Sequence, residues 1–253
     1  MQENMSDTLV KVPQVTLLFW IIKIAATTLG ETAGDAASMS LNLGYLLSTV
    51  LFTGLFLLTL RAQIKATTFH PMLYWATIIA TTIVGTTLAD FADRSLGIGY
   101  AGGTLLLLSL LFGTLFSWHR SLGSISIHSL STPRAEYFYW VTILFSQTLG
   151  TALGDWTADS AGLGYRGAAV IFGLMLLVVL AAYLWTHISR TALFWAAFIL
   201  TRPLGAVVGD FLDKPLAAGG LDLSRFTASA VLMAFIVMCL LLFRQRPAER
   251  ASH

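Results

Sequence analysis

The chain has 253 residues, of which 56% are apolar and 11% are charged, and its formal net charge is +2 at pH 7. A soluble domain of this length carries roughly a quarter of its residues as charged side chains, so the composition argues against that class. The small net charge gives no basis for binding nucleic acid.

Long apolar stretches recur along the chain at the length that a membrane requires. Each covers about 17 to 21 residues, enough for a helix to cross the hydrocarbon layer. In chain order, we predict membrane spans at 14–34, 45–61, 71–89, 100–118, 137–154, 167–186, 191–209 and 226–244. The sequence therefore predicts an all-α fold class, a polytopic bundle of eight transmembrane helices in the lipid bilayer, with residues 1–253 as a single membrane domain.

The sequence near the two ends of the chain argues against a cleavable secretory signal and a disulfide framework. Residues 1–13 contain Glu3, Asp7 and Lys11 and lack a basic segment, so we expect no cleavable secretory signal. The single cysteine, Cys239, lies in the last predicted span, which excludes a disulfide framework within the chain.

Lysine and arginine are divided unevenly between the two faces that the predicted spans create. The face that holds both termini carries nine of them: Lys11, Arg61, Lys65, Arg120, Arg134, Arg190, Arg244, Arg246 and Arg250. The other face carries four: Arg94, Arg166, Lys214 and Arg225. Because basic loops stay in the cytoplasm, we expect both termini there. The five histidines lie on the basic face without the spacing of metal ligands.

A motif recurs four times at constant spacing. It begins with a tryptophan that follows Phe or Tyr: Trp20, Trp75, Trp140 and Trp195. A glycine follows each tryptophan after ten residues: Gly30, Gly85, Gly150 and Gly205. Five residues later comes an aspartate: Asp35, Asp90, Asp155 and Asp210. A further glycine follows after nine residues: Gly44, Gly99, Gly164 and Gly219. The motif divides the chain into repeats at about 14–62, 71–119, 137–187 and 191–244, and the fourth copy diverges after Asp213.

Each repeat contains two predicted spans, so all four copies enter the membrane in the same orientation, as parallel repeats. The first span of each copy carries a polar stripe, which must face the interior of the bundle or water. The second span is richer in Leu, Val and Phe and is the better candidate for the wall that faces lipid. Pairs of small residues such as Gly30 and Gly34 allow the helix backbones to approach closely.

A second carboxylate lies about one helical turn from each repeated aspartate. The pairs are Glu31 with Asp35, Asp90 with Asp93, Asp155 with Asp159, and Asp210 with Asp213. All eight should gather at one rim of the bundle, and hard cations prefer such clustered oxygen ligands. Our candidate metal ligands are Glu31, Asp35, Asp155 and Asp159, with a divalent cation as the substrate. The alternative is structural, with the aspartates bonded to loop amides or to Arg94, Arg166 or Lys214.

The repeat breaks its own symmetry near the middle of the membrane. Seven residues after the tryptophan, the copies carry Thr27, Thr82, Gln147 and Arg202. A buried arginine requires a partner or a water-filled cavity, and we expect Glu31 of the first repeat to be that partner. Lys23 lies nearer the cytoplasmic edge, where it either belongs to the same polar path or extends to the interface. The candidate ion-binding residues are therefore Lys23, Glu31, Asp35, Asp90, Gln147, Asp155, Arg202 and Asp210.

The repeated tryptophans fit interfacial anchors or packing residues better than a site that stacks a substrate. The sequence contains no nucleotide-binding loop, serine-hydrolase motif, zinc-protease motif or pair of redox cysteines. We therefore expect that the protein is not an enzyme.

Four tandem two-span copies, each with a tryptophan and an aspartate after a small-xxx-small pair, resemble a family of uncharacterised bacterial membrane proteins. This family is defined by a repeat of unknown function, and its members are usually labelled membrane-anchored proteins. The similarity runs from about Phe19 to Phe243 and is closest in LGTALGDWTADSAGLGY of the third copy. The resemblance implies the four-repeat fold and a bacterial inner-membrane location, and it transfers no catalytic residue.

These features together lead us to expect a transporter or channel for a small solute, with a cation as the favoured substrate. The alternative is a non-transporting scaffold or regulatory protein in which the buried charges only hold the fold. A water-filled path along the polar faces would favour transport, and a dry, packed axis would favour the scaffold. The sequence leaves the oligomeric state open.

Overall fold

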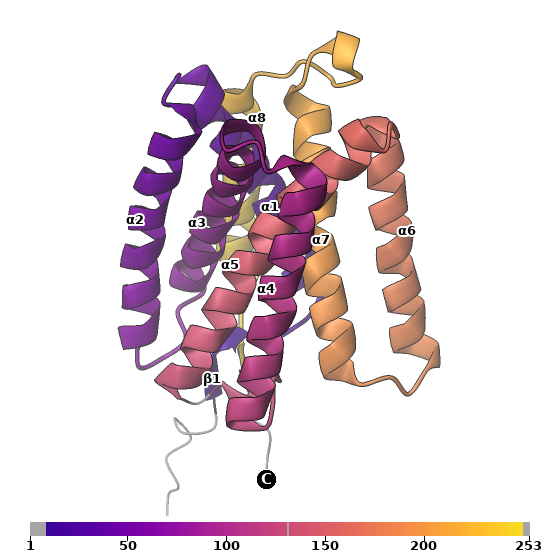
Figure 1. Ribbon diagram of the computed structural model, residues 1–253. Coiled ribbons are helices and arrows are strands. Elements are labelled where there is room, and N and C mark those ends of the chain that lie inside the picture. The colour runs from indigo at the N-terminus through magenta and orange to yellow at the C-terminus, as the bar shows by residue number, and fades with distance from the viewer. Residues whose placement is uncertain (1–8, 131, 250–253) are drawn as a thin grey trace, which may run out of the picture.

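The computed structural model describes residues 9–130 and 132–249, and eight long helices dominate this part of the chain (Figure 1). Their bounds are α1 (Leu17–Asp35), α2 (Gly44–Lys65), α3 (Pro71–Asp90), α4 (Gly99–Leu122), α5 (Pro133–Asp155), α6 (Gly164–Trp185), α7 (Arg190–Asp213) and α8 (Arg225–Leu242). A π-helical turn extends α1, α3 and α5, at Ala36–Ser40, Phe91–Ser95 and Trp156–Ser160. Each predicted span coincides with one helix, which confirms the all-α fold class.

The odd-numbered helices begin at residues suited to the start of a helix. The side chain of Thr16 accepts a hydrogen bond from the amide of Phe19 (3.3 Å), and that of Thr132 accepts one from Ala135 (3.2 Å). These bonds satisfy amides that have no partner within the first turn. α3 begins at Pro71, whose missing N–H is not needed at that position.

Three even-numbered helices begin at the glycine that follows the repeated aspartate. The backbone φ angles are +73° at Gly44, +74° at Gly99 and +63° at Gly164. L-residues with a side chain rarely adopt this left-handed conformation, so the turn between the two helices of a repeat requires glycine. The spacing of this glycine in the sequence therefore reflects the geometry of the loop.

The helices form two layers. α1, α3, α5 and α7 pack side by side in a closed inner ring, in which each contacts the next and α7 contacts α1. α2, α4, α6 and α8 lie outside this ring, and Figure 1 shows α2 and α6 on its opposite flanks. Each outer helix packs on the inner helix of the following repeat: α2 on α3, α4 on α5, α6 on α7, and α8 on α1. The repeats are therefore interlocked around the ring.

Burial separates the two layers. In the most apolar stretch of each helix, 67% of the residues of α1 and 78% of those of α3 are buried, against 11% in α2, α4 and α6. The outer helices expose many Leu, Val and Phe side chains, as a surface in contact with lipid does. This arrangement confirms that the first helix of each repeat faces inward and the second faces outward.

Seven of the eight helices are long and apolar enough to cross a membrane. The exception is α5, which is 23 residues long and carries the polar side chains of Glu136, Ser146 and Gln147 among its buried residues. α5 lies between α3 and α7 in the inner ring, where these groups face protein instead of lipid. Its lower hydropathy therefore follows from its central position.

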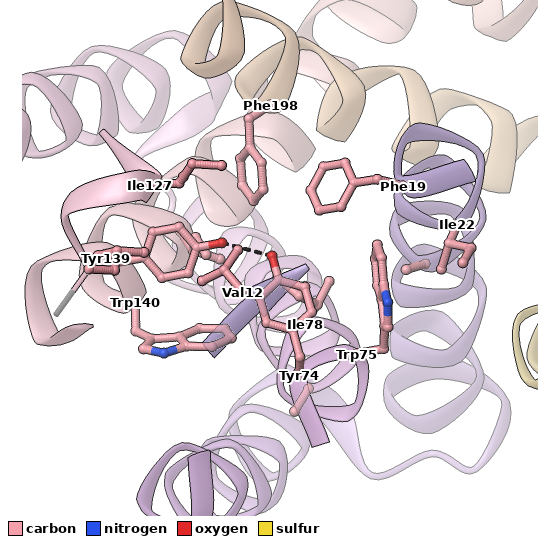
Figure 2. Close-up of a cluster of buried hydrophobic side chains, with 14 of the residues drawn as sticks. Val12, Phe19, Ile22, Tyr74, Trp75, Ile78, Ile127, Tyr139, Trp140 and Phe198 are labelled. Carbon is pink, nitrogen blue, oxygen red and sulfur yellow. Dashed lines mark hydrogen bonds between the residues drawn. The ribbon is translucent and has the colours of Figure 1, made fainter. Parts of the chain in front are cut away.

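A short pair of strands joins the ends of the described chain. β1 (Leu9–Pro13) pairs antiparallel with β2 (Pro247–Glu249), so both ends lie on one face of the bundle. Val12 lies among the aromatic side chains of the inner ring, beside Tyr139 and Tyr74 (Figure 2). Lys11 bonds to the carbonyls of Gln63 and Ile64 at the end of α2. No pattern in the sequence predicts this strand pair, which packs against the aromatic end of the ring.

Candidate functional site

The inner ring is held together by contacts that repeat at each helix pair. A Cβ atom added to Gly30 would lie 2.4 Å from Thr82 Cβ, and one added to Gly205 would lie 2.5 Å from Thr27 Cβ. The same relation joins Gly85 to Gln147 and Gly150 to Arg202. The glycine of each repeat therefore packs on the residue seven positions after the tryptophan of the next repeat. Only glycine permits this close approach, which gives the ring a quasi-four-fold symmetry.

Because of this symmetry, residues four positions apart form successive layers along the axis of the ring. The first layer, nearest the strand pair, contains Lys23, Ile78, Ile143 and Phe198. The second contains Thr27, Thr82, Gln147 and Arg202. The third contains Glu31, Thr86, Thr151 and Ala206. The fourth is the set of repeated aspartates, Asp35, Asp90, Asp155 and Asp210. All sixteen side chains are buried, none more than 4% exposed.

Arg202 and Glu31 occupy the centre of this stack. Both terminal nitrogens of Arg202 lie 3.1 Å from Glu31 Oε2. Arg202 Nη2 also donates to the hydroxyls of Thr86 (2.6 Å) and Thr151 (2.5 Å). All four inner helices meet at this cluster or beside it, since Gly150 packs on the stem of Arg202. The pairing of Arg202 with Glu31 that the sequence predicted is confirmed.

The repeated aspartates are joined across repeats by three basic side chains. Arg94 lies 2.9 Å from Asp90 and 3.3 Å from Asp155. Lys214 contacts both Asp35 (2.5 Å) and Asp210 (3.0 Å). Arg225 Nε lies 3.3 Å from Asp213 and 3.8 Å from Asp35. Each cation therefore bridges two carboxylates from different helices or loops.

The contacts of Arg166 and Arg225 differ from what the sequence suggested. Arg166, considered there as a partner of an aspartate, instead lies over the ring of Phe211, 5.0 Å from its centre. The sequence indicates Arg225 only as a loop charge, yet its side chain reaches Asp213 and Asp35. No repeat pattern indicates that role, because the fourth repeat departs from the others just before Arg225.

Lys214 lies in the loop that follows α7, outside the membrane-spanning helices. Burial by itself would lower the pKa of its ammonium group, but the carboxylates of Asp210, Asp35 and Asp213 raise that pKa well above its ordinary value. Lys214 therefore remains charged at neutral pH and continues to bridge the first and fourth repeats.

Two groups of three carboxylates have geometry that could hold a cation. The first consists of Glu31, Asp155 and Asp210, and the second of Asp35, Asp210 and Asp213. Within each group, one oxygen of every residue lies within 4.8 Å of the others. Carboxylate oxygens at such separations suit a hard cation.

The structure changes the candidate metal ligands in one respect. Asp159, which the sequence placed with Glu31, Asp35 and Asp155, is exposed and belongs to neither group. Asp210 belongs to both groups and holds the central position instead. Asp159 ends up apart because it lies in the π-helical turn after α5, beyond the end of the ring.

The remaining candidates lie on the other side of Arg202, towards the strand pair. Lys23 and Gln147 are both fully buried. In the described part of the chain, the ammonium of Lys23 and both amide atoms of Gln147 lack a hydrogen-bond partner. Lys23 Nζ lies 4.1 Å from the centre of the Phe198 ring, so it does not extend to the interface.

The repeated tryptophans belong to an aromatic cluster at the strand end of the ring. Trp75, Trp140 and Trp195 are almost fully buried, and Trp20 is partly buried. Figure 2 shows Trp75 and Trp140 among Phe19, Tyr74 and Tyr139, whose hydroxyl lies 2.7 Å from that of Tyr74. These contacts fit a packing role for the tryptophans.

A comparison with protein-family models finds one repeated match. The model described as Repeat of Unknown Function (DUF347) matches at residues 18–68, 73–124, 138–189 and 193–246. These four matches cover most of the chain and coincide with the four two-helix units. Searches of curated proteins and of solved structures give no match.

Proposed function

The chain belongs to the family defined by this repeat, and we propose that it is a carrier for a small cation in the bacterial inner membrane. The observation that carries the proposal is a deficit of positive charge at the acidic end of the ring. Seven buried carboxylates face four basic side chains there: Glu31, Asp35, Asp90, Asp93, Asp155, Asp210 and Asp213 with Arg94, Arg202, Lys214 and Arg225. Cations bound at this end would offset the excess of carboxylates.

The group formed by Glu31, Asp155 and Asp210 is the binding site we infer. Its oxygens lie close enough to share one ion, and Glu31 connects it to Arg202. A bound cation would compete with Arg202 for the carboxylate of Glu31. The hydroxyls of Thr86 and Thr151 would hold the arginine side chain when Glu31 releases it. Arg202 would then act as the internal cation that occupies the site in the absence of substrate.

The packed axis supports a carrier over an open channel. The side chains of the four layers are all buried. Two hollows of about 340 and 640 Å³ lie elsewhere, one beside the strand pair and one on the outer face of α4 and α5. Movement of an ion past Arg202 therefore requires a change in the ring. With both termini in the cytoplasm, the acidic end would face the periplasm and attract cations.

Ion flux into proteoliposomes tests this function. Glu31→Gln and Asp155→Asn should abolish uptake of the cation that the unmodified protein moves, with Na⁺, K⁺, Mg²⁺ and Mn²⁺ as the probes. Asp159→Asn is the matched control, because Asp159 is a carboxylate of the same end that is exposed and outside both groups. Uptake should survive in this control. Absence of flux of every probe in the unmodified protein would refute the proposal.

A specific observation favours a second function, a non-transporting scaffold. Arg94 and Lys214 each tie carboxylates of two repeats together, as a purely structural role predicts, and the axis is packed. A scaffold moves no cation, so Asp155→Asn would change only the amount of folded protein. If the protein is a carrier, the fraction of Asp155→Asn protein that remains folded should no longer take up the cation.

A further inference from the structure

A set of buried polar atoms remains without partners between Arg202 and the strand pair. Lys23 Nζ, Arg202 Nε, and both Gln147 amide atoms lack a hydrogen bond to any residue that the structure describes. All three side chains are 0% exposed. An unpaired polar atom in a buried position is costly, and an unpaired charge costs more. These atoms therefore point to an occupant other than protein.

The three side chains lie in adjacent layers on the inner face of the ring. Gln147 and Arg202 belong to the same layer, and Lys23 belongs to the layer one helical turn nearer the strands. The other side chains of that nearer layer, Ile78, Ile143 and Phe198, are apolar, and Ile78 and Phe198 belong to the cluster drawn in Figure 2. Apolar side chains therefore border this position on the side of the strand pair, and the Arg202–Glu31 ion pair borders it on the opposite side.

Two basic side chains, Lys23 and Arg202, lie at this position, and only Arg202 has an ion-pair partner among the described residues. Glu31 pairs with Arg202, and the other carboxylates of the inner ring's acidic end lie in the layer beyond Glu31. The Phe198 ring, 4.1 Å from Lys23 Nζ, offers a cation–π contact that offsets only part of the cost of burying an ammonium. With Arg202 paired to Glu31, an ammonium at Lys23 would need one negative charge beside it.

We propose that a small monovalent oxyanion binds on the axis between Lys23, Gln147 and Arg202. The ammonium of Lys23, the Nε–H of Arg202 and the amide NH₂ of Gln147 would donate to its oxygens. The carbonyl of Gln147 would accept a hydrogen bond from a hydroxyl of the anion, which hydrogencarbonate carries. This site shares only Arg202 with the cation site at the acidic end, and its test does not depend on cation transport.

Thermal unfolding of the purified protein in detergent tests for the site. Sodium salts of hydrogencarbonate, acetate, nitrate and chloride are titrated at constant ionic strength against gluconate, a much larger anion that serves as the reference. We expect hydrogencarbonate to raise the unfolding temperature saturably, since a ligand that binds only the folded state stabilises it. If every salt gives the same curve as gluconate, the unpaired atoms are met by water and the proposal is wrong.

Two variants assign the effect to these residues. Lys23→Met should weaken the apparent affinity for the anion by about tenfold or more, the loss expected for a charged hydrogen bond. Arg120→Gln, which removes an exposed charge at the end of α4, should leave the affinity unchanged. An equal response in Lys23→Met and the unmodified protein would overturn the assignment.

Gln147→Glu tests the proposal even if the Lys23→Met variant does not fold. The new carboxylate would stand in for the bound anion and pair with Lys23. This variant should unfold at a higher temperature than the unmodified protein in gluconate and should no longer respond to hydrogencarbonate. A variant that keeps the full anion response would show that the anion binds elsewhere. Both measurements are made without transport, so they succeed or fail independently of the flux experiment.

Discussion

Arg202 and Glu31 are 171 residues apart in the sequence, yet their side chains form an ion pair of 3.1 Å at the centre of the ring. The pair joins α7 to α1, the last and first helices of the inner ring, and so contributes to closing it. Thr86 and Thr151, from the two remaining inner helices, bond to the same arginine. One cluster therefore draws a residue from each of the four repeats.

The first prediction concerns the strength of this pair. Arg202→Gln or Glu31→Gln alone should lower the free energy of unfolding by about 3–5 kcal/mol, because each leaves an uncompensated buried charge. The double variant should lose less than the sum of the two single losses. Unfolding measured in detergent for all four proteins gives the coupling. Simple additivity of the single effects would contradict a direct interaction.

The second prediction concerns the glycines of the inner ring. A Cβ atom at Gly85 would lie 2.8 Å from the carbonyl carbon of Gln147, a backbone atom that a rotamer change cannot move. Gly85→Ala should therefore destabilise the protein by about 1–3 kcal/mol, as overpacking does. The measurement is the unfolding temperature in detergent.

The control for this substitution is Gly54→Ala on the outer helix α2. A Cβ atom there would meet nothing within 4 Å. Alanine is the better helix former by about 0.5–1 kcal/mol, so this variant should be as stable as the unmodified protein or more stable. Equal losses at both positions would mean that the ring does not depend on close approach at Gly85.

The third prediction concerns orientation in the membrane. In a Cys239→Ala background, a cysteine at Ser160 should react with an impermeant thiol reagent added outside intact cells. Ser160 is exposed at the acidic end, where few basic residues lie in the loops. A cysteine at Ser121, exposed at the end of α4, should react only after lysis. The reverse pattern would invert the proposed topology, although both chain ends would still lie on one face.

Much of the fold follows from local features of the sequence. The length of the apolar stretches indicates the helices, and the repeat spacing identifies the four units. The inward face of α1, α3, α5 and α7 follows from helical periodicity, since Glu31, Gln147 and Arg202 all lie on the polar stripe. Even the partner of Arg202 could be predicted, because few buried carboxylates lie at its depth.

Other features of the site could not be read in this way. Asp159 and Asp213 each accompany a repeated aspartate, but only Asp213 belongs to a carboxylate group. The difference lies in the backbone, because α7 remains helical through Asp213 whereas α5 ends at Asp155 in a π-helical turn. Arg225 reaches Asp35 through a loop that differs from those of the other repeats, so no pattern could assign its partner.

The sequence by itself determined the number of helices and their division into two kinds, because periodicity and hydropathy act within one helix. Only the tertiary structure decided that each outer helix packs on the following repeat, that β1 and β2 close one end, and that Lys23 and Gln147 remain unpaired. These features depend on how helices pack and on where loops direct them. Contacts between distant segments determine both, and no local pattern records those contacts.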